Sequence, residues 1–562
     1  MLITFFLCLF ITALCWTWGL LTIDCLNKTL RNNNDTQLHF SITCLVGLAA
    51  ITTFSSVLSL FMPLGGLLAL LLIMLPCIFV FFLKSFKQQI KNLKAFFFNI
   101  HVSFILLFLV CLILVLFMNS WYINNEDTLG YHAQIIQWIE KYKAVPGIAH
   151  LHARYGLQNS WFVSCALFSF SFLKTHALTF INSAVLAWYL FFVISKANKN
   201  LFNKNILHAF LWIILLLFSL WSYTQVRLAA TTASPDFIAT LYTWLLFYLL
   251  ITHASNKDSI SFALIAILSI FTITIKLSAA LVIILAIYSV VRLLDLKKLK
   301  TAILCILCCT IILSSFVARN IISSGYPAFP STFPDIVNKD WKFKKENGEL
   351  IQNYITAYAR IKSKATVDDI EKIVSMKLSE WVPGWWKNQS LADKSIIAIT
   401  ILSFLFLLTR IKKIIQSNWE IKIALATALT GIFFWFVKAP DPRFGFGFLI
   451  TVPAIASGCF MHFNNNTELY WKKILIAFVL LMSVALGGYI IYRVINFFSP
   501  SQFVSPNGIR PVNYKTVKCN GTDINIPVII YGCGSTDIPC AYDSCKTFEP
   551  RGTKITDGFR AK

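Results

Sequence analysis

The stretch HVSFILLFLVCLILVLFMNSWYINNEDTLGYHAQIIQWIEKY, residues 101–142, decides the class of fold. It opens with an unbroken apolar run of about 20 residues, which as a helix would cross the roughly 30 Å of hydrocarbon in a bilayer. Two adjacent carboxylates, Glu126 and Asp127, follow a few residues later and lead into a segment that is apolar on one side. The stretch therefore predicts a transmembrane helix that ends at a polar, interfacial segment.

Apolar runs of this kind recur along the whole chain. Of its 562 residues, 57% are hydrophobic and 13% are charged, whereas soluble globular proteins have about 25% charged residues. Continuous apolar runs also argue against a membrane β-barrel, which needs short alternating strands. The sequence predicts an all-α, polytopic transmembrane helical bundle of about fourteen spans. We place them near residues 2–24, 39–62, 64–84, 98–119, 160–195, 207–222, 237–254, 260–275, 278–294, 301–318, 394–410, 420–438, 446–463 and 473–497. The fifth region is too long for one straight span, so we expect a short helix and then a span, with a break near Lys174 and His176.

Basic residues indicate how the spans are oriented. Lys and Arg collect in alternate short loops, and loops of that kind stay cytoplasmic. This pattern accounts for the net charge of +24 without a nucleic-acid partner. The basic loops are KSFKQQIKNLK (84–94), KANKNLFNKN (196–205), RLLDLKKLK (292–300), RIKK (410–413) and WKK (471–473). We therefore expect a multi-pass protein of the cell inner (plasma) membrane with both termini extracytoplasmic.

The predicted spans divide the chain into five parts. Residues 1–95 form N-terminal transmembrane helices, and residues 96–318 form a transmembrane core whose first outer loop covers 120–159. An extracytoplasmic loop at 319–393 mixes charges with aromatics, so we expect several helices there that rest on the membrane. Further transmembrane helices occupy 394–497, and an outer tail follows at 498–562.

The tail is rich in cysteine. Eleven of the 15 cysteines lie in or near predicted spans, where cysteine behaves as a small apolar residue. The other four are Cys519, Cys533, Cys540 and Cys545. Because no CxxC pair occurs among them, we expect no zinc site there. In an oxidising compartment they predict up to two structural disulfides, with three pairings open.

Glu126 and Asp127 stand at the start of a predicted interfacial helix. Ile135, Ile136 and Ile139 follow helical spacing, so one face of this helix is apolar and lies in the plane of the membrane surface. A carboxylate at this depth is beside both lipid headgroups and water, where it can serve as a base for a substrate at the membrane surface. The alternative is that Asp127 only caps the helix, since Asp is a preferred N-cap residue.

Other polar residues cluster in segments that the predicted orientation puts on the same side. Charges at membrane depth are costly and face a cavity or one another, so these clusters predict one shared polar cavity. Several cations with few carboxylates indicate an anionic ligand, such as a phosphate or diphosphate. The candidates for phosphate binding are Arg154, Arg227, Lys276, Arg319 and Arg443, and the supporting polar groups are Tyr131, Asp236, Asp441 and Asn320.

Simpler roles stay open for several of these residues. Cations near the ends of spans can extend to lipid headgroups. Lys276 has little loop around it, so it can instead form a buried ion pair with Asp236 or Asp441. His132 either orients a substrate hydroxyl or is an ordinary interfacial histidine.

The stretch DTLGYHAQIIQWI (127–139) resembles the D-x-L-x-Y-H-…-W stretch of bacterial polytopic proteins in the GT-C glycosyltransferase superfamily. That superfamily includes protein O-mannosyltransferases and the lipid A aminoarabinose transferases. The chain is more similar still to a bacterial family of membrane proteins, and this likeness covers most of residues 120–562. Members of that family carry segments like RYGLQNSWF (154–162), SPDF (234–237), RNIISSGYPAFP (319–330), APDPRFGFG (439–447) and RGTKITDGFR (551–560). One departure is that three extra spans precede the first outer loop here, whereas in many superfamily members this loop follows the first span.

The resemblance implies a glycosyltransferase. It implies transfer of a sugar from a polyprenyl-phosphate-linked donor, on the outer face, to a glycan, lipid or protein acceptor in cell-surface glycan or lipopolysaccharide assembly. It maps the superfamily's outer-loop carboxylate onto Asp127, which would deprotonate the acceptor hydroxyl. Arg319 and Arg443 would stabilise the leaving phosphate, and Glu126 or His132 would orient the acceptor. No cofactor is expected to be required, although a divalent cation that bridges Asp127 to the donor phosphate stays open.

Two other functions stay open as well. A polysaccharide polymerase or ligase that acts on lipid-linked glycans would also sit in the membrane and can rely on arginines in place of a carboxylate. A lipid or solute transporter is the third class, and it favours repeated halves with broken helices near the midplane. The sequence has no visible internal repeat, and its polar residues gather on one side.

Overall fold

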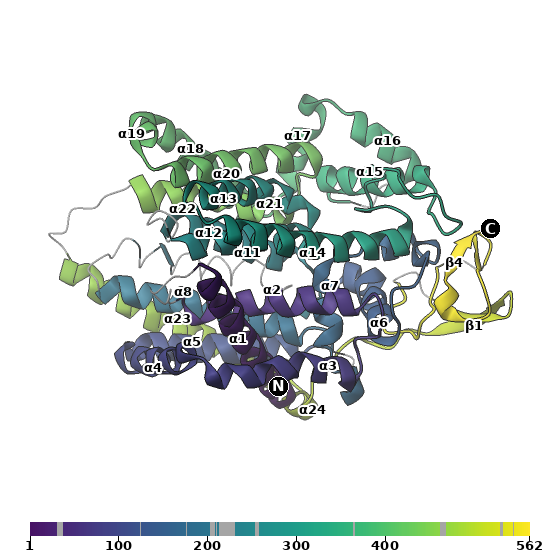
Figure 1. Cartoon of the computed structure of the whole chain (residues 1–562), viewed down its shortest axis with the longest axis horizontal. Coiled ribbons are helices and arrows are strands. Elements are labelled where there is room, and N and C mark those ends of the chain that lie inside the picture. The colour runs from purple at the N-terminus through teal and green to yellow at the C-terminus, as the bar shows by residue number, and fades with distance from the viewer. Residues whose placement is uncertain are drawn as a thin grey trace.

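A computed structural model describes residues 1–30, 38–123, 125–175, 177–202, 208, 211–212, 231–252, 258–363, 366–460, 468–528, 532–542 and 545–562. Long helices dominate it, and the labelled strands lie at one end (Figure 1). Ten helices within these ranges are long and apolar enough to cross a membrane. The protein is therefore a helical multi-pass membrane protein, as the composition predicts.

The ten apolar helices run from α1 to α23 along the chain. They are α1 (Leu2–Leu30), α2 (Phe40–Leu58), α5 (Val102–Asn119), α8 (Phe180–Phe202), η8 with α13 (Leu277–Val282, Ile283–Asp295), α14 (Leu299–Ser324), α18 (Leu391–Thr409), α20 (Trp419–Lys438), α21 with α22 and η9 (Pro442–Leu449, Thr451–Ile455, Ala456–Phe460), and α23 (Glu468–Phe497).

The predicted count of fourteen spans is not confirmed. Two of the predicted spans are the shorter apolar helices α11 (Asp236–Thr252) and α12 (Ser259–Ile275), of 17 residues each. At 1.5 Å per residue they measure about 26 Å, less than the roughly 30 Å of a typical hydrocarbon core. A third consists of α3 (Leu67–Met74) and η1 (Leu75–Phe82), which bend by 84° into the basic helix α4 (Lys84–Asn99). The span predicted near 207–222 lies outside the described residues.

Helices α1 and α2 cross closely because a glycine stands on each side of the contact. A Cβ atom added to Gly47 would lie 1.7 Å from the carbonyl oxygen of Cys15, and one added to Gly19 would lie 2.0 Å from that of Thr43. Small residues let helix backbones approach in this way inside a membrane. The N-terminal helices are thus packed against the rest of the core.

The fifth predicted span is broken, as expected. Helix α7 (Ser160–Leu167) ends, the short helix η5 (Ser171–Leu173) follows, and α8 then crosses the membrane. Phe170 and Lys174 flank η5 with φ values of 48° and 54°, in the left-handed region that no α-helix continues through. The predicted break at Lys174 is confirmed, and His176 lies outside the described residues.

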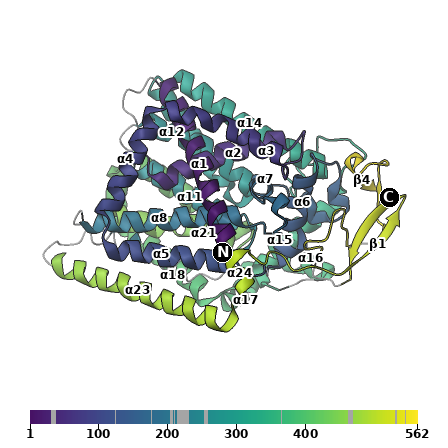
Figure 2. The ribbon, with the colours of Figure 1, turned by 90° about the horizontal axis from the view of Figure 1, so that it is seen from below.

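The segments predicted to be outer loops share one end of the bundle. Figures 1 and 2 both show the strands, α6 and the α15–α16 pair at one end, and the basic helix α4 at the other. The first loop contains η2 (Thr128–His132), α6 (Ala133–Lys141), η3 (Ile148–His150) and η4 (Ala153–Gly156), and the long loop contains α15 (Lys345–Ile361), α16 (Val367–Ser375) and α17 (Leu378–Asn388). The amino group of Met1 donates to the carbonyl oxygen of Gln502 in α24 (Pro500–Val504), at 2.7 Å. The expectation of several helices in the long loop is confirmed, and which end faces the cytoplasm stays a prediction.

The tail departs from the all-α expectation. Strands β1 (Tyr514–Cys519) and β2 (Thr522–Pro527) form an antiparallel hairpin, and β3 (Phe548–Pro550) pairs with β4 (Phe559–Ala561) around the short helix η11 (Ile555–Asp557). Two disulfides join Cys519 to Cys545 and Cys533 to Cys540, one of the three pairings that the sequence left open.

The disulfide-closed segment of the tail sits on the first outer loop. The amide of Gly534 donates to the carbonyl oxygen of Leu129 at 2.8 Å. The hydroxyl of Tyr542 donates to the carbonyl oxygen of Gly130 at 3.2 Å. Both acceptors belong to η2, the turn that begins next to Asp127. The tail therefore holds the backbone of the segment that the sequence singles out.

Candidate functional site

Asp127 precedes the π-helical turn η2, but it does not cap it. Within the described residues its carboxylate makes no capping hydrogen bond. Asn125 takes that role, because its side-chain oxygen accepts a hydrogen bond from the amide of Thr128 at 2.8 Å. The interpretation of Asp127 as only a helix cap is therefore wrong, and its carboxylate, 30% exposed, is available for other contacts.

Two arginines from distant segments flank this carboxylate. The guanidinium nitrogen Nη1 of Arg154, in η4, lies 3.5 Å from one carboxylate oxygen of Asp127. Nη1 of Arg443, in the first turn of α21, lies 3.5 Å from the other. These distances are longer than the usual 2.7–2.9 Å of a charge-assisted hydrogen bond. The contacts are thus loose ion pairs that a better acceptor can replace.

Arg443 also connects Asp127 to two further carboxylates. Its Nε lies 3.3 Å from Asp441 and 3.8 Å from Asp236. The local sequence fixes its position, because Asp441 caps α21 by accepting a hydrogen bond from the Arg443 amide at 3.2 Å and Pro442 occupies the first helical position. One guanidinium therefore joins the starts of η2, α11 and α21.

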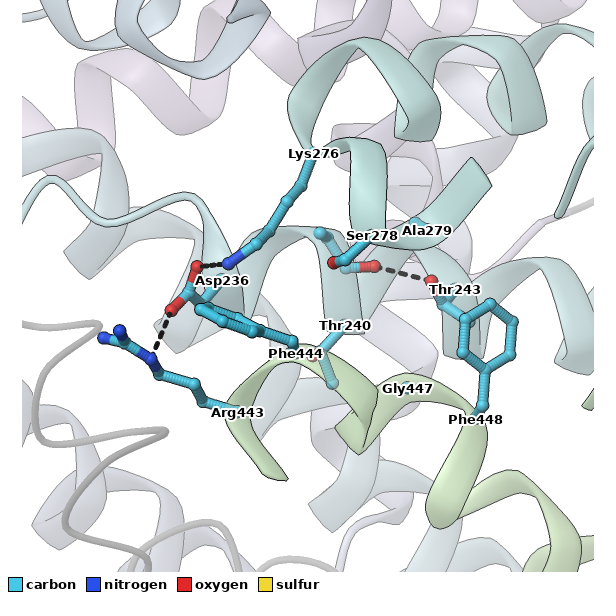
Figure 3. Close-up of a pocket in the computed structure, with 11 residues that line it drawn as sticks. Asp236, Thr240, Thr243, Lys276, Ser278, Ala279, Arg443, Phe444, Gly447 and Phe448 are labelled. Carbon is cyan, nitrogen blue, oxygen red and sulfur yellow. Dashed lines mark hydrogen bonds and ion pairs between the residues drawn. The ribbon is translucent and has the colours of Figure 1, made fainter. Parts of the chain in front are cut away.

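Lys276 completes the group. It ends α12 in an extended conformation, and its ammonium forms an ion pair with Asp236 at the start of α11. The same ammonium lies 3.8 Å from the ring centre of Phe444. Figure 3 shows Lys276 and Arg443 approaching Asp236 from opposite sides. Of the two ion-pair partners left open for Lys276, the structure favours Asp236.

We call this group the charged cluster; its members are Asp127, Asp236, Asp441, Arg154, Lys276 and Arg443. Three carboxylates face three cations, so the cluster is formally neutral. Among the described residues, the expected excess of cations over carboxylates is not found in this cluster. The reason is that Arg319 lies elsewhere, while Arg227 lies outside the described residues.

A small cavity adjoins the cluster. Its lining comes from α11, η8 and α21, and includes Asp236, Thr240, Thr243, Lys276, Ser278, Arg443 and Phe444. The enclosed space holds about one water molecule. As it stands, the cavity fits a single polar atom of a ligand, and a larger ligand must sit on the exposed side of Asp127.

Tyrosines from the long outer loop cover the arginines. The guanidinium carbon of Arg154 lies 5.2 Å from the ring centre of Tyr354 and 5.7 Å from that of Tyr131. That of Arg443 lies 5.9 Å from the ring centre of Tyr358. Sequence reasoning found Tyr131 but missed Tyr354 and Tyr358. The available signal was their spacing of four residues, which puts both on one face of α15.

His132 is not at the exposed side of the site. Its ring is 2% exposed, lies 4.9 Å from the ring of Phe162, and has its Nδ1 3.1 Å from the hydroxyl of Thr128. Burial lowers the pKa of His132 to about 4, so it is neutral at pH 7. In this conformation the buried ring of His132 supports η2. Glu126, next to Asp127 in the sequence, is exposed.

Arg319 and Asn320 do not join the charged cluster. They lie near the end of α14 and line a second small cavity, together with residues of α2 and of the segment before α7. No described residue lines both cavities. The prediction of one cavity shared by all the cations is therefore wrong for Arg319. Among the described residues, Lys276 and Arg443 line the same cavity, and Arg154 joins the charged cluster only through Asp127.

No metal centre is found among the residues that the structure describes: none of their His, Cys, Asp and Glu side chains form a group of three or more that could hold an ion. The three carboxylates of the charged cluster are instead joined through Arg443.

Comparisons with known proteins agree on family alone. No curated protein and no solved structure matches the chain. The family described as a domain of unknown function (DUF8201) matches residues 1–450, four fifths of the sequence. The matched part contains every member of the charged cluster and ends before the cysteine-bearing tail. The chain belongs to this DUF8201 family.

Proposed function

We propose that this protein is a membrane glycosyltransferase that moves a sugar from a polyprenyl-phosphate-linked donor to an acceptor on the extracytoplasmic face. The observation that carries the proposal is the setting of Asp127. Asn125 caps the helix in place of Asp127. Arginines from two other segments each have a guanidinium nitrogen 3.5 Å from the Asp127 carboxylate. The resemblance of its loop to GT-C enzymes supports the same assignment, with the spans following a GT-C-like plan.

The reaction begins with the acceptor hydroxyl beside Asp127. The carboxylate removes the hydroxyl proton as the oxygen attacks the anomeric carbon of the donor sugar. The bond between that carbon and the phosphate oxygen breaks, and the phosphate leaves with the electron pair. Transfer with inversion follows, because attack and departure take place on opposite faces of the sugar.

The charge of the cluster fits this step. Before the reaction, three carboxylates balance three cations. When Asp127 gains the proton, Asp236 and Asp441 are left facing Arg154, Lys276 and Arg443, so the cluster carries a net charge of +1. The leaving phosphate gains a negative charge at the same moment. Fixed cations next to developing negative charge are an effective means of transition-state stabilisation.

Donor binding also prepares the base. A phosphate is a better partner for a guanidinium than a carboxylate at 3.5 Å. A donor phosphate that draws Arg154 and Arg443 toward itself releases Asp127 to face the acceptor. The exposed Glu126 is the group that we assign to acceptor orientation. The polyprenyl chain would lie along the spans, in the lipid of the inner membrane, and the acceptor would be a glycan, lipid or protein of the cell envelope.

The direct test uses purified full-length protein in proteoliposomes with a labelled polyprenyl-phosphate-linked sugar. Asp127→Asn keeps the shape of the side chain but removes the base, so transfer should fall by roughly 10²- to 10⁴-fold. The matched control is Asp368→Asn, the same change at an exposed position of α16. A fully active Asp127→Asn protein would end the proposal.

The same assay separates the alternatives. A polymerase or ligase that depends on arginine would lose activity with Arg443→Gln and keep it with Asp127→Asn. A transporter would carry the labelled lipid across the membrane without releasing free polyprenyl phosphate. Release of that product together with a labelled acceptor is the result expected for transfer.

A further inference from the structure

Arg319 is a buried cation that has no counter-ion among the described residues. Its side chain is 7% exposed, and no described carboxylate lies within 4 Å of it. Its hydrogen bonds to described residues come from Nη1 alone, to the hydroxyl and carbonyl oxygens of Ser59 at 3.3 and 3.4 Å. Its Nε is fully buried and has no hydrogen-bond partner within the described part of the chain. A buried charge left without a partner is strongly destabilising, so this arrangement needs an explanation.

The cavity beside Arg319 is lined by neutral hydrogen-bonding groups. Its polar lining residues are Ser56, Gln158, Asn159, Ser160, Ser315 and Asn320. The hydroxyl of Ser56 is also buried without a partner among the described residues. Hydroxyls and side-chain amides can donate hydrogen bonds to an anion. Gln158, Ser160, Ser315 and Asn320 already donate to other protein oxygens. The cavity thus offers the positive charge of Arg319 and the free hydroxyl of Ser56, which together suit an anionic group.

This cavity is distinct from the charged cluster but adjacent to it. The hydroxyl of Ser160, which lines the Arg319 cavity, donates to the hydroxyl of Thr274 at 2.9 Å. Thr274 lies two residues before Lys276, on the last turn of α12. The start of α7 therefore separates two sites of different character, one with balanced charges and one with a lone cation.

The position of the cavity along α14 indicates what enters it. Arg319 lies five residues before Ser324, the end of α14, which is roughly 7.5 Å along the helix axis. Ser59 directly follows α2, and Ser160 is the first residue of α7. All three sit near helix ends, at the level where lipid headgroups meet the hydrocarbon. Ile311, eight residues before Arg319 and roughly 12 Å back along α14, is about half exposed on the bundle surface, where lipid would contact it.

We infer that the Arg319 cavity binds the phosphate group of a membrane lipid. The unpartnered Nε–H of the guanidinium is a charged donor that suits a phosphate oxygen. The enclosed space holds about one water molecule, so one phosphate oxygen enters it while the rest of the headgroup lies toward the bilayer. This lipid site does not depend on the proposed sugar transfer, since no described residue lines both cavities.

The test measures the thermal stability of the purified full-length protein in a neutral detergent. Added phosphatidylglycerol should raise the melting temperature of the wild type. Arg319→Gln should remove that rise and weaken lipid binding by roughly 10- to 100-fold, as expected for lost hydrogen bonds between charged groups. Without lipid, Arg319→Gln should be at least as stable as the wild type, because the substitution removes an uncompensated buried charge.

Controls keep the result specific. Lys438→Gln removes one exposed positive charge at the same end of the spans and should keep the lipid response. Asp127→Asn should keep it too, whatever its effect on transfer. A lipid response that survives in Arg319→Gln would overturn the site. An equal response to inorganic phosphate alone would overturn the assignment to a lipid, and a lipid-free Arg319→Gln that melts well below the wild type would show that the protein itself satisfies Arg319.

Discussion

Arg443→Gln is the perturbation that best tests the charged cluster as a unit. Arg443 lies 3.3, 3.5 and 3.8 Å from the carboxylates of Asp441, Asp127 and Asp236. At an effective dielectric constant of about 20, each contact is worth about 4 to 5 kcal/mol before desolvation. Desolvation offsets most of that sum, and removing one partner of a buried ion pair typically costs about 3–5 kcal/mol. We therefore expect Arg443→Gln to lower the free energy of unfolding by about that amount.

A second substitution shows where the cost arises. Without Arg443, Asp236 still has its ion pair with Lys276, and Asp127 still has its ion pair with Arg154. Asp441 has no other ion-pair partner within 4 Å among the described residues. Adding Asp441→Asn to Arg443→Gln removes the stranded charge, and Asn caps a helix as well as Asp. The double variant should thus recover about 1–3 kcal/mol relative to additivity.

Tryptophan fluorescence follows unfolding in detergent, and two of the 16 tryptophans contact the turn before Arg443. The indole nitrogens of Trp435 and Trp385 donate to the carbonyl oxygens of Asp441 and Pro440, at 2.7 and 2.6 Å. Arg410→Gln, at an exposed position, is the matched control and should stay within about 0.5 kcal/mol of the wild type. If Arg443→Gln behaves like this control, or if the two substitutions are additive, the cluster is not a coupled unit and the reasoning is refuted.

Two further predictions concern the first outer loop. Burial lowers the pKa of His132 from 6.5 to about 4, so folding favours the neutral form of its ring. The folded state therefore loses up to about 3 kcal/mol of stability as the pH drops from 6.5 to 4. The melting temperature of His132→Gln should therefore change less between pH 7 and pH 5 than that of the wild type. An equal change in the two proteins would contradict the burial of an uncharged ring. The Cys533–Cys540 disulfide closes a loop with a sequence separation of 7, worth about 2 kcal/mol in the chain-entropy account. Replacing both cysteines with serine should speed hydrogen exchange at the amides of η2, and unchanged exchange there would show that the tail does not hold this turn.

Several parts of the fold and site follow from the sequence alone. The apolar runs identify the spans, and the left-handed residues at Phe170 and Lys174 fall where the excess length of the fifth region predicts a break. Asp127, Asp236, Lys276 and Arg443 each stand at the same end of a predicted span. Since the chain alternates direction at each span, such residues reach one level of the bundle, and the structure brings these four together.

What the sequence does not reveal is the position of each residue around the bundle. Arg319 reaches the correct level on α14, but helix packing turns it toward Ser59 and away from Arg443. Hydropathy also does not predict the bend after η1, because a straight and a bent apolar segment have the same hydropathy. Tyr354 and Tyr358 lie in an amphipathic loop helix whose docking partner only the tertiary structure identifies.

The docking of the tail onto η2 sets an order of events during synthesis. The hydrogen bond from Tyr542 to Gly130 spans 412 positions of the chain. At about 5–20 residues per second, a ribosome needs roughly 20 to 80 seconds to reach the second partner after the first. Throughout that interval the nascent chain has its early helices inserted but the turn beside Asp127 uncovered. A segment translated 412 positions after Gly130 thus completes the surroundings of Asp127.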